Sequence, residues 1–150
     1  MFWDNRAKSL EDQAKGPLTA EAEMRGKAYS EKDILPELVN RLSAIPDYVA
    51  RFERVFGAGS VNDHNLVSAI AAFERALVTR PSYARYLAGE TTALSAAAKR
   101  GLDAFQRDGC DNCHSGPMLS DYALHRFTRD GEAIRTPSLR NVTRTAPYMH

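Results

Sequence analysis

Apolar residues recur at helical spacing along most of the chain beyond residue 30, and this pattern predicts a helical protein. The strongest pattern spans 63–79 and contains four apolar residues three or four positions apart: Leu66, Ile70, Phe73 and Leu77. Asn62 or Asp63 offers a side-chain N-cap for this helix, and Pro81 stops it. The segment is therefore expected to be a long amphipathic helix.

Weaker versions of the same pattern predict four more helices, at 33–44, 47–56, 83–87 and 95–107. Asp33 is the expected cap of the first, Gly57 ends the second, and Ser95 caps the last. Leu102 and Phe105 are expected to point toward the core. We find no alternating apolar pattern long enough for a sheet, so the fold class predicted is all-α.

Residues 2–29 are mostly polar and lack this regularity. Gly16, Pro17 and Gly26 interrupt them, which leaves room for a short helix around 9–15 at most. On composition, this segment is predicted to be a linker or an arm that lies across a larger body.

Composition excludes several classes of protein. Hydrophobic residues make up 43% of the 150 positions and charged residues 26%, which is ordinary for a globular domain with a core. The formal net charge is +1 with scattered Lys and Arg, so a nucleic-acid partner is not expected. The apolar runs are too short for a membrane span, and no export signal is recognisable at the start.

The only two cysteines lie in Cys110-Asp111-Asn112-Cys113-His114, the attachment signature of a c-type haem. Two thiols at this spacing can add across the two vinyl groups of a porphyrin. The histidine directly behind the second thiol then presents an imidazole nitrogen to the iron. A haem c cofactor with His114 as an iron ligand is therefore expected, in an all-α, cytochrome c-like domain.

A thioredoxin-like redox pair and half of a zinc site are the alternatives for the same motif. A zinc site would need two more Cys or His at ligand spacing, and no second pair follows in the sequence. A thioredoxin motif would lie between a strand and a helix, whereas these flanks are predicted to be helix and irregular loop. Haem is normally attached outside the cytoplasm, so we expect a periplasmic protein whose natural start differs from Met1.

Several separated segments together resemble the bacterial di-haem cytochrome c peroxidases, a family that includes the MauG-type enzymes. The segments are Phe2–Ala7, Glu23–Met24, Ala76–Ser82, the haem motif with Ser115–Pro117, Thr136–Val142 and Thr145–His150. In that family the N-terminal haem reduces hydrogen peroxide. The C-terminal haem takes electrons from a small cytochrome or cupredoxin.

The resemblance implies that 1–29 are the inter-domain arm and 30–150 the C-terminal haem domain, truncated at its C-terminus. With one haem motif in this chain and two in the family, the first haem domain and the C-terminal tail are expected to be missing. Family members are often homodimers, so a homodimer is also expected.

Individual site residues follow from the same resemblance. Trp3 resembles the tryptophan that helps electrons pass between the two haems. Gln13 and Pro17 resemble residues of the peroxide pocket, and Glu23 resembles its acid–base carboxylate, which moves a proton between the two peroxide oxygens. Arg135 resembles an arginine beside the haem propionates.

The resemblance also implies a calcium site, with the backbone carbonyls of Thr145 and Pro147 among its ligands. Its side-chain ligand in the family lies upstream of Met1. Arg140 is a weaker candidate than Arg135 for a propionate contact.

The sequence departs from the family at Asn5, where glycine is usual, and in the short loop between His125 and Arg135. The sixth iron ligand, a methionine or a tyrosine in the family, lies beyond His150. Met149 stays a lesser candidate for this ligand within the chain. Met118 is expected to pack, His64 to be solvated, and His125 and His150 to make hydrogen bonds near the haem.

Three functions remain open on the sequence. The first is the electron-entry domain of a peroxidase that reduces hydrogen peroxide to water. The second is a mono-haem electron carrier without peroxidase activity. The third is MauG-like oxidation of a partner protein.

Overall fold

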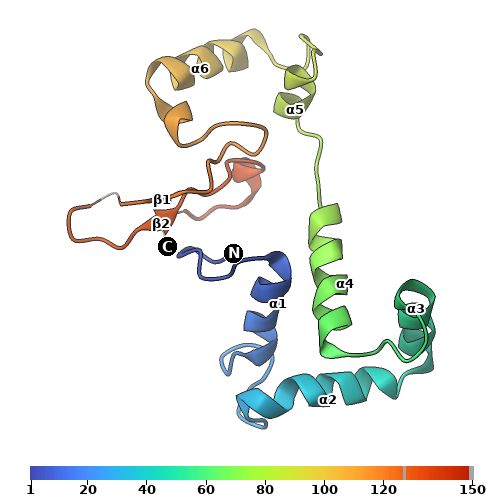
Figure 1. The fold of residues 1–150 in the computed structure, drawn as a ribbon. Coiled ribbons are helices and arrows are strands. Elements are labelled where there is room, and N and C mark those ends of the chain that lie inside the picture. The colour runs from blue at the N-terminus through green and yellow to red at the C-terminus, as the bar shows by residue number, and fades with distance from the viewer. Residues whose placement is uncertain (127, 149–150) are drawn as a thin grey trace. The chain divides into compact units, whose positions relative to one another are not determined.

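The structure, a computed structural model, describes residues 1–126 and 128–148 and is mostly helical, as predicted. In this part of the chain the elements are α1 (Leu10–Thr19), α2 (Glu31–Ser43), α3 (Pro46–Phe56), α4 (Asp63–Ala76), α5 (Ser82–Leu87) and α6 (Ala96–Arg107), then the 3-10 helix η1 (Cys110–Asn112), strands β1 (Leu124–His125) and β2 (Ile134–Arg135), and the 3-10 helix η2 (Val142–Arg144). Figure 1 shows them in chain order.

The chain forms two compact units. Unit 1 contains Met1–Phe2 and Arg6–Leu77, and unit 2 contains Trp3–Asn5 and the chain from Val78 onward. The contacts therefore divide the chain at Leu77, whereas the sequence-based division lies between Tyr29 and Ser30. The assignment of 1–29 and 30–150 to parts of a larger architecture stays a prediction.

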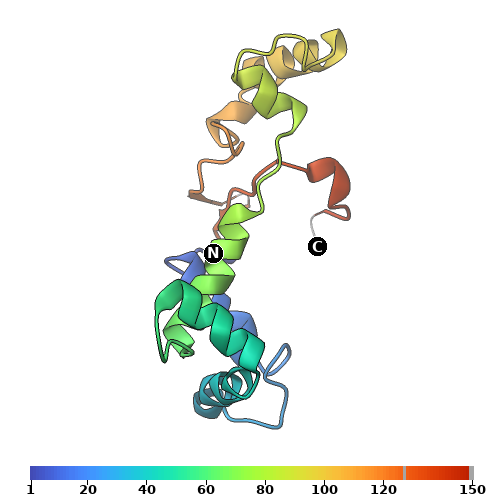
Figure 2. The same cartoon turned by 90° about the vertical axis from the view of Figure 1, so that its right-hand side faces the viewer.

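Unit 1 is built on the packing of α1 against α4, which lie side by side in Figures 1 and 2. Ala14, Leu18 and Val67 form its buried centre. Partly buried apolar residues of α2 and α4 surround this centre: Leu35, Leu38, Leu66 and Ile70. Ala14 and Leu18 of α1 therefore lie at the centre of the core of unit 1.

The prediction of at most a short helix around 9–15 was wrong, because α1 continues through Gly16 and Pro17 to Thr19. Its start matches a good cap, since the Ser9 side chain accepts a hydrogen bond from the Asp12 N–H at 3.1 Å. Pro17 cannot donate to the Gln13 carbonyl, which costs helix stability. Burial of the apolar face of α1 against α4 offsets that cost.

The remaining helices of unit 1 begin and end close to their predicted bounds. Ser30, rather than Asp33, occupies the N-cap position of α2, and Gly57 follows α3 with φ +95°, a conformation that favours glycine. Asn62 caps α4 by accepting a hydrogen bond from the Asn65 N–H at 2.9 Å. The α4 helix ends at Ala76 rather than at Thr79.

The apolar stripe predicted for α4 is not buried along its whole length. Val67 and Ala71 are fully buried, whereas Phe73 and Leu77 are 64% and 66% exposed. Only the first three turns of α4 therefore contribute buried side chains to unit 1 among the described residues.

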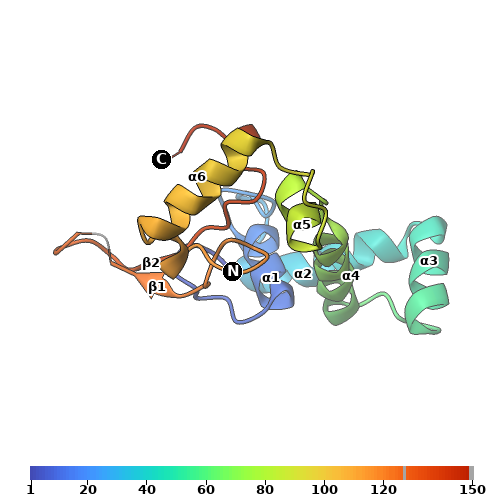
Figure 3. The ribbon, with the colours of Figure 1, turned by 90° about the horizontal axis from the view of Figure 1, so that it is seen from above.

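Unit 2 contains α5, α6 and a small antiparallel sheet in which Leu124 pairs with Arg135 and His125 with Ile134 (Figure 3). Its only buried residues in the described part are polar, Ser120 and Thr136. Leu102 and Phe105 of α6, expected to point into a core, are half-buried. In the described ranges, none of the helices combines the length and apolar character needed to cross a membrane.

Candidate haem-attachment site

The Cys110–His114 motif lies at the end of α6. Gly109 adopts φ +77°, which turns the chain out of the helix and into η1. The His114 N–H then donates to the Cys110 carbonyl at 3.0 Å, so one tight turn holds the motif together. Both thiols are free, with Cys110 exposed and Cys113 half-buried. The local fold thus presents two thiols and an imidazole from a single short segment.

His114 is oriented by a backbone partner. Its Nδ1 lies 3.1 Å from the Leu119 carbonyl oxygen. A carbonyl can only accept, so this contact requires Nδ1 to carry the proton and leaves the lone pair on Nε2. Metal-ligating histidines usually have such a partner on the second ring nitrogen. The imidazole is therefore in the tautomer that an iron ligand at Nε2 needs.

The surroundings of the motif fit a porphyrin. The ring centroids of Phe105 and His114 lie 6.4 Å apart, and Leu102 lies one turn earlier on α6. These apolar side chains are half-buried in a unit whose described part buries no apolar residue of its own. Two thiols, one imidazole in the right tautomer and an apolar helix face are the groups that would hold haem c.

The loop after the motif is bound firmly to the small sheet. The Asp121 N–H donates to the Cys113 carbonyl at 2.8 Å, and the Ser120 hydroxyl donates to the Thr136 carbonyl at 2.7 Å. The Thr136 N–H donates in turn to the Ala123 carbonyl at 3.0 Å. Because these partners are mainly backbone groups, the position of the loop depends little on which side chains it carries.

Trp3 and Arg135 meet through their backbones. The Arg135 N–H donates to the Trp3 carbonyl at 2.7 Å, which places the start of the chain beside β2 in unit 2. The Trp3 side chain is 56% exposed, and the Arg135 guanidinium lies over the Tyr122 ring at 5.2 Å. Asn5 has φ +56°, a backbone conformation that glycine adopts readily and asparagine tolerates.

The residues expected in a peroxide pocket belong to unit 1. Gln13 and Pro17 lie one turn apart on α1, and both are half-buried. Glu23 is exposed in the turn that follows, where the neighbouring Met24 N–H donates to the Pro17 carbonyl at 3.2 Å. Gln13 and Pro17 therefore share one side of α1, and Glu23 lies in the turn after the helix.

Thr145 and Pro147, the expected calcium ligands, are both exposed after η2. The Thr145 N–H donates to the Val142 carbonyl at 3.4 Å. A calcium ion at their carbonyls stays a prediction.

Arg140 is engaged inside unit 2. Its guanidinium donates to the Thr79 carbonyl and to the Met118 sulfur, the latter at 3.4 Å. Met118 is thus held by an arginine. His64 is exposed on α4, and Met149 and His150 lie outside the described residues.

Sequence reasoning missed a pair beside the motif. His125 Nε2 and Asp121 Oδ2 lie 2.7 Å apart, and the Asp121 Oδ1 accepts from the Ala123 N–H at 3.0 Å. The nearby Thr136 hydroxyl, then the His125 ring, lower the pKa of Asp121 to about 2. The four-residue spacing of Asp121 and His125 was visible in the sequence, but only the folded loop brings them to Cys113.

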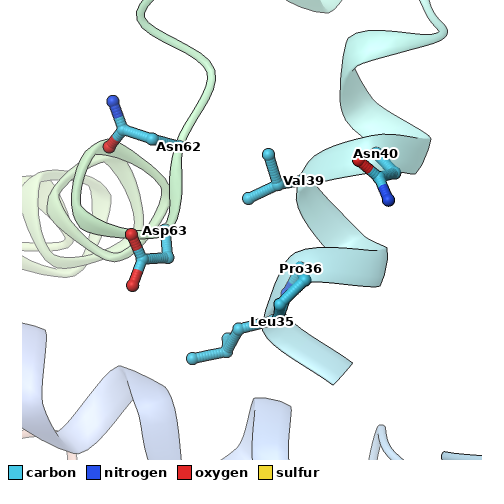
Figure 4. Close-up of a pocket in the computed structure, with 6 residues that line it drawn as sticks. All are labelled: Leu35, Pro36, Val39, Asn40, Asn62 and Asp63. Atoms are coloured by element: carbon cyan, nitrogen blue, oxygen red, sulfur yellow. The ribbon is translucent and has the colours of Figure 1, made fainter. Parts of the chain in front are cut away.

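A pocket of about 390 Å³ lies in unit 1 between α2 and the start of α4 (Figure 4). Leu35, Pro36, Val39 and Asn40 line it from α2, and Asn62 and Asp63 from α4. None of the site residues predicted from the sequence lines this pocket. It therefore adds no group to the candidate site.

A helical fold with this motif defines a c-type haem protein, and comparison with known proteins specifies the family. The model of the di-haem cytochrome c peroxidase family matches residues 1–92, upstream of the motif. Cytochrome c551 peroxidase of Pseudomonas aeruginosa is 37% identical over 99% of the chain, and methylamine utilization protein MauG of Methylophilus methylotrophus is 33% identical over all of it. The chain belongs to the di-haem cytochrome c peroxidase family, whose cofactor is haem c.

A solved structure supports the same assignment. A MauG-like protein associated with microbial copper homeostasis superimposes with a TM-score of 0.80 at 28% identity, and the match covers all of this chain and 54% of that one. The chain also spans 49% of each of the two curated relatives named above. The similarity therefore concerns about half the length of these proteins.

Proposed function

We propose that this chain carries the electron-entry haem of a di-haem cytochrome c peroxidase. Cys110, Cys113 and His114 would hold haem c, which would supply a one-electron iron couple. The observation that carries the proposal is the contact between His114 Nδ1 and the Leu119 carbonyl, which leaves Nε2 available in the same motif as both thiols. Family membership supplies the reaction class.

The proposed overall reaction converts one hydrogen peroxide, two electrons and two protons into two waters. The electrons would come one at a time from a reduced small cytochrome or cupredoxin, and a second haem, bound by another part of the full protein, would supply the peroxide chemistry. We place Trp3 on the electron route, because its backbone is fixed to β2 of the haem-bearing unit. The location proposed is the periplasm, the compartment in which haem c is attached in bacteria.

Unit 1 would supply the proton chemistry. Glu23 is the proposed acid–base group, and Gln13 and Pro17 shape the peroxide pocket from α1. A carboxylate can take a proton from the nearer peroxide oxygen and return it to the departing one, which allows the O–O bond to break heterolytically. Thr145 and Pro147 are the proposed calcium ligands through their backbone carbonyls, and Arg135 the proposed partner of a haem propionate.

MauG-like oxidation of a partner protein is the second candidate. The observation that favours it is the 33% identity to a MauG protein, comparable to the 37% identity to a peroxidase. A mono-haem electron carrier is the third, favoured by the single pair of cysteines.

One experiment separates these candidates. The natural gene product that carries this chain is purified with its haems, reduced with a small c-type cytochrome, and mixed with hydrogen peroxide. We expect two haems per protein and oxidation of two cytochromes for each peroxide consumed. One haem with no peroxide consumption would contradict the peroxidase proposal and favour the carrier. Two haems with no peroxide turnover in the presence of donor would instead favour oxidation of a partner protein.

A further inference from the structure

Three side chains of unit 2, one of them a thiol of the haem motif, form a compact set of metal-binding groups. A ligand atom of Cys113, of Asp121 and of His125 all lie within 4.8 Å of one another. In the part of the chain that the structure describes, this is the only group of three or more Cys, His, Asp or Glu side chains gathered this closely. The set combines one thiol, one carboxylate and one imidazole.

We infer that the chain, before haem attachment, binds a zinc ion through Cys113, Asp121 and His125. Zinc accepts thiolate, imidazole and carboxylate ligands in tetrahedral geometry, with bonds of about 2.0–2.3 Å, so neighbouring ligand atoms lie roughly 3.5 Å apart. The three atoms here span up to 4.8 Å, and a shift of about 1 Å closes the site around the ion. A water molecule can take the fourth position.

The backbone fixes two of the three ligands to each other. The Asp121 N–H donates to the Cys113 carbonyl at 2.8 Å, so the backbones that carry the thiol and the carboxylate keep their separation without the ion. The Asp121 Oδ1 accepts a hydrogen bond from the Ala123 N–H at 3.0 Å. The other carboxylate oxygen, Oδ2, is left to face His125, the third ligand. Little chain entropy is therefore lost when the metal enters.

His125 already points toward this carboxylate. Its Nε2 lies 2.7 Å from Asp121 Oδ2, and the pairing of His125 with Ile134 anchors its backbone in the sheet. Zinc would replace this hydrogen bond, with a ring nitrogen and the carboxylate oxygen both turning to the ion. The side chains of His125 and Asp121 are 36% and 23% exposed, so an ion can enter from solvent.

The charges suit a divalent cation. A thiolate and a carboxylate contribute two negative charges, and a neutral imidazole contributes none, so the loaded site is neutral. The nearest cation on the paired strand, the Arg135 guanidinium, lies over the Tyr122 ring. The buried Thr136 hydroxyl makes no hydrogen bond of ordinary geometry among the described residues, although it lies close enough to Asp121 to lower the pKa of that carboxyl. It is available to support the carboxylate when the histidine turns away.

Zinc and haem would exclude each other at this site. When a porphyrin vinyl group adds to Cys113, the sulfur becomes a thioether, which loses its charge and ligates zinc poorly. Zinc binding displaces one proton from the thiol and must be reversed before haem is attached. The site therefore belongs to the unmatured chain, where it protects one of the two thiols.

The test uses the full 150-residue chain produced without haem, in which both thiols are free. Cobalt(II) replaces zinc as a coloured probe, because a cobalt–thiolate bond gives a charge-transfer band in the near ultraviolet. We expect one cobalt per chain with such a band. Cys113→Ser should abolish the band, and His125→Ala or Asp121→Asn should weaken binding at least about tenfold.

Two matched variants serve as controls. Cys110→Ser removes the other thiol of the motif, and His64→Ala removes an exposed histidine of α4. Both should keep the cobalt affinity within about twofold of the parent chain. Equal loss in Cys110→Ser and Cys113→Ser, or unchanged affinity in His125→Ala, would overturn the inference.

A second measurement needs no variant and so does not depend on the folding of one. The parent chain is alkylated with iodoacetamide with and without zinc, and modification of each cysteine is followed by mass spectrometry. Zinc should slow alkylation of Cys113 and leave Cys110 nearly unchanged. Equal protection of both thiols, or none, would contradict the site.

The inference is independent of the proposed function. A chain that binds cobalt as described but never accepts haem would contradict the peroxidase proposal and leave the metal site standing. A chain that accepts haem but shows no cobalt–thiolate band beforehand would contradict the metal site and leave the peroxidase proposal standing. In the haem-loaded chain the cobalt–thiolate band should be absent, and its persistence would contradict the role of Cys113.

Discussion

The backbone N–H of Arg135 donates a hydrogen bond to the carbonyl oxygen of Trp3 at 2.7 Å. This contact joins two positions that lie far apart in the sequence and adds the start of the chain to the edge of β2. Next to it, the Asn5 side chain donates to the Tyr122 carbonyl at 3.0 Å. The tryptophan proposed for electron transfer is thus held by the unit that carries the haem motif.

Replacing Asn5 tests whether its side-chain hydrogen bond to the Tyr122 carbonyl holds the start of the chain on unit 2. Asn5→Ala removes the bond to Tyr122 and leaves a β-carbon at φ +56° without compensation, so it should lower the free energy of unfolding by about 1–2 kcal/mol. Asn5→Gly loses the same bond but tolerates the backbone, so its cost should be smaller. Urea denaturation measures both. A glycine variant less stable than the alanine variant would contradict this explanation.

The core of unit 1 predicts a large difference between two valines. Val67 is 1% exposed in α4, and Val55 is 71% exposed in α3. Val67→Ala should lower the free energy of unfolding by about 2 kcal/mol, because it removes two buried methyl groups and leaves a cavity. Val55→Ala should change it by less than about 0.5 kcal/mol. Similar costs at the two positions would show that α1 and α4 do not form the core.

A pH effect is expected at the ion pair between α1 and α4. The Arg75 guanidinium donates to both carboxylate oxygens of Glu11, at 2.7 and 3.0 Å, and lowers the pKa of Glu11 from 4.5 to about 2. A depressed carboxyl pKa stabilises the fold above the unfolded value, and this stabilisation is lost as the pH falls from 4.5 toward 2. Arg75→Gln should return the Glu11 pKa toward 4.5.

NMR titration of the Glu11 carboxyl carbon measures this shift directly. Arg54→Gln, on the exposed side of α3, is the control and should leave the Glu11 pKa low. The stability difference between the parent and Arg75→Gln should also shrink between pH 6 and pH 2. An unchanged Glu11 pKa in Arg75→Gln would refute the pairing.

The proposed acid–base role of Glu23 is tested against a neighbour in the same turn. Glu23→Gln should lower peroxide turnover by about 10²–10⁴-fold, because the amide cannot take up the proton. Reduction of the haem by the donor should stay unchanged, since that step needs no proton from Glu23. Glu21→Gln changes another exposed carboxylate of this turn and should leave turnover near the parent value. Equal losses in the two variants would point to a general charge effect.

Most helices were predictable because their signals are local. Asn62 and Ser95 cap the helices that follow them, and Gly57 ends α3 at the residue expected. The exception is α1, where Gly16 and Pro17 indicate a break. A Cβ at Gly16 would lie 2.6 Å from the Phe2 ring, and the buried face of α1 rests on α4, so tertiary packing overrides the local signal.

The candidate site likewise combines a local motif that the sequence reveals with a tertiary arrangement that it does not. The motif at Cys110, Cys113 and His114 is readable because haem attachment needs a fixed spacing in the sequence. The gathering of Asp121 and His125 at Cys113 is not, because it depends on a loop whose course is set by backbone bonds to β2. The resemblance named Trp3 and Glu23 without placing them, and the fold assigns them to different units.

The account depends most directly on covalent haem attachment at one motif. The chain is expressed with a c-type maturation system, digested, and examined by mass spectrometry together with its haemochrome spectrum. We predict one haem per chain, carried by the peptide that contains both Cys110 and Cys113, and a changed absorption spectrum of the undigested haem protein in His114→Ala. A matured chain without bound haem, or one whose spectrum does not depend on His114, would contradict the account.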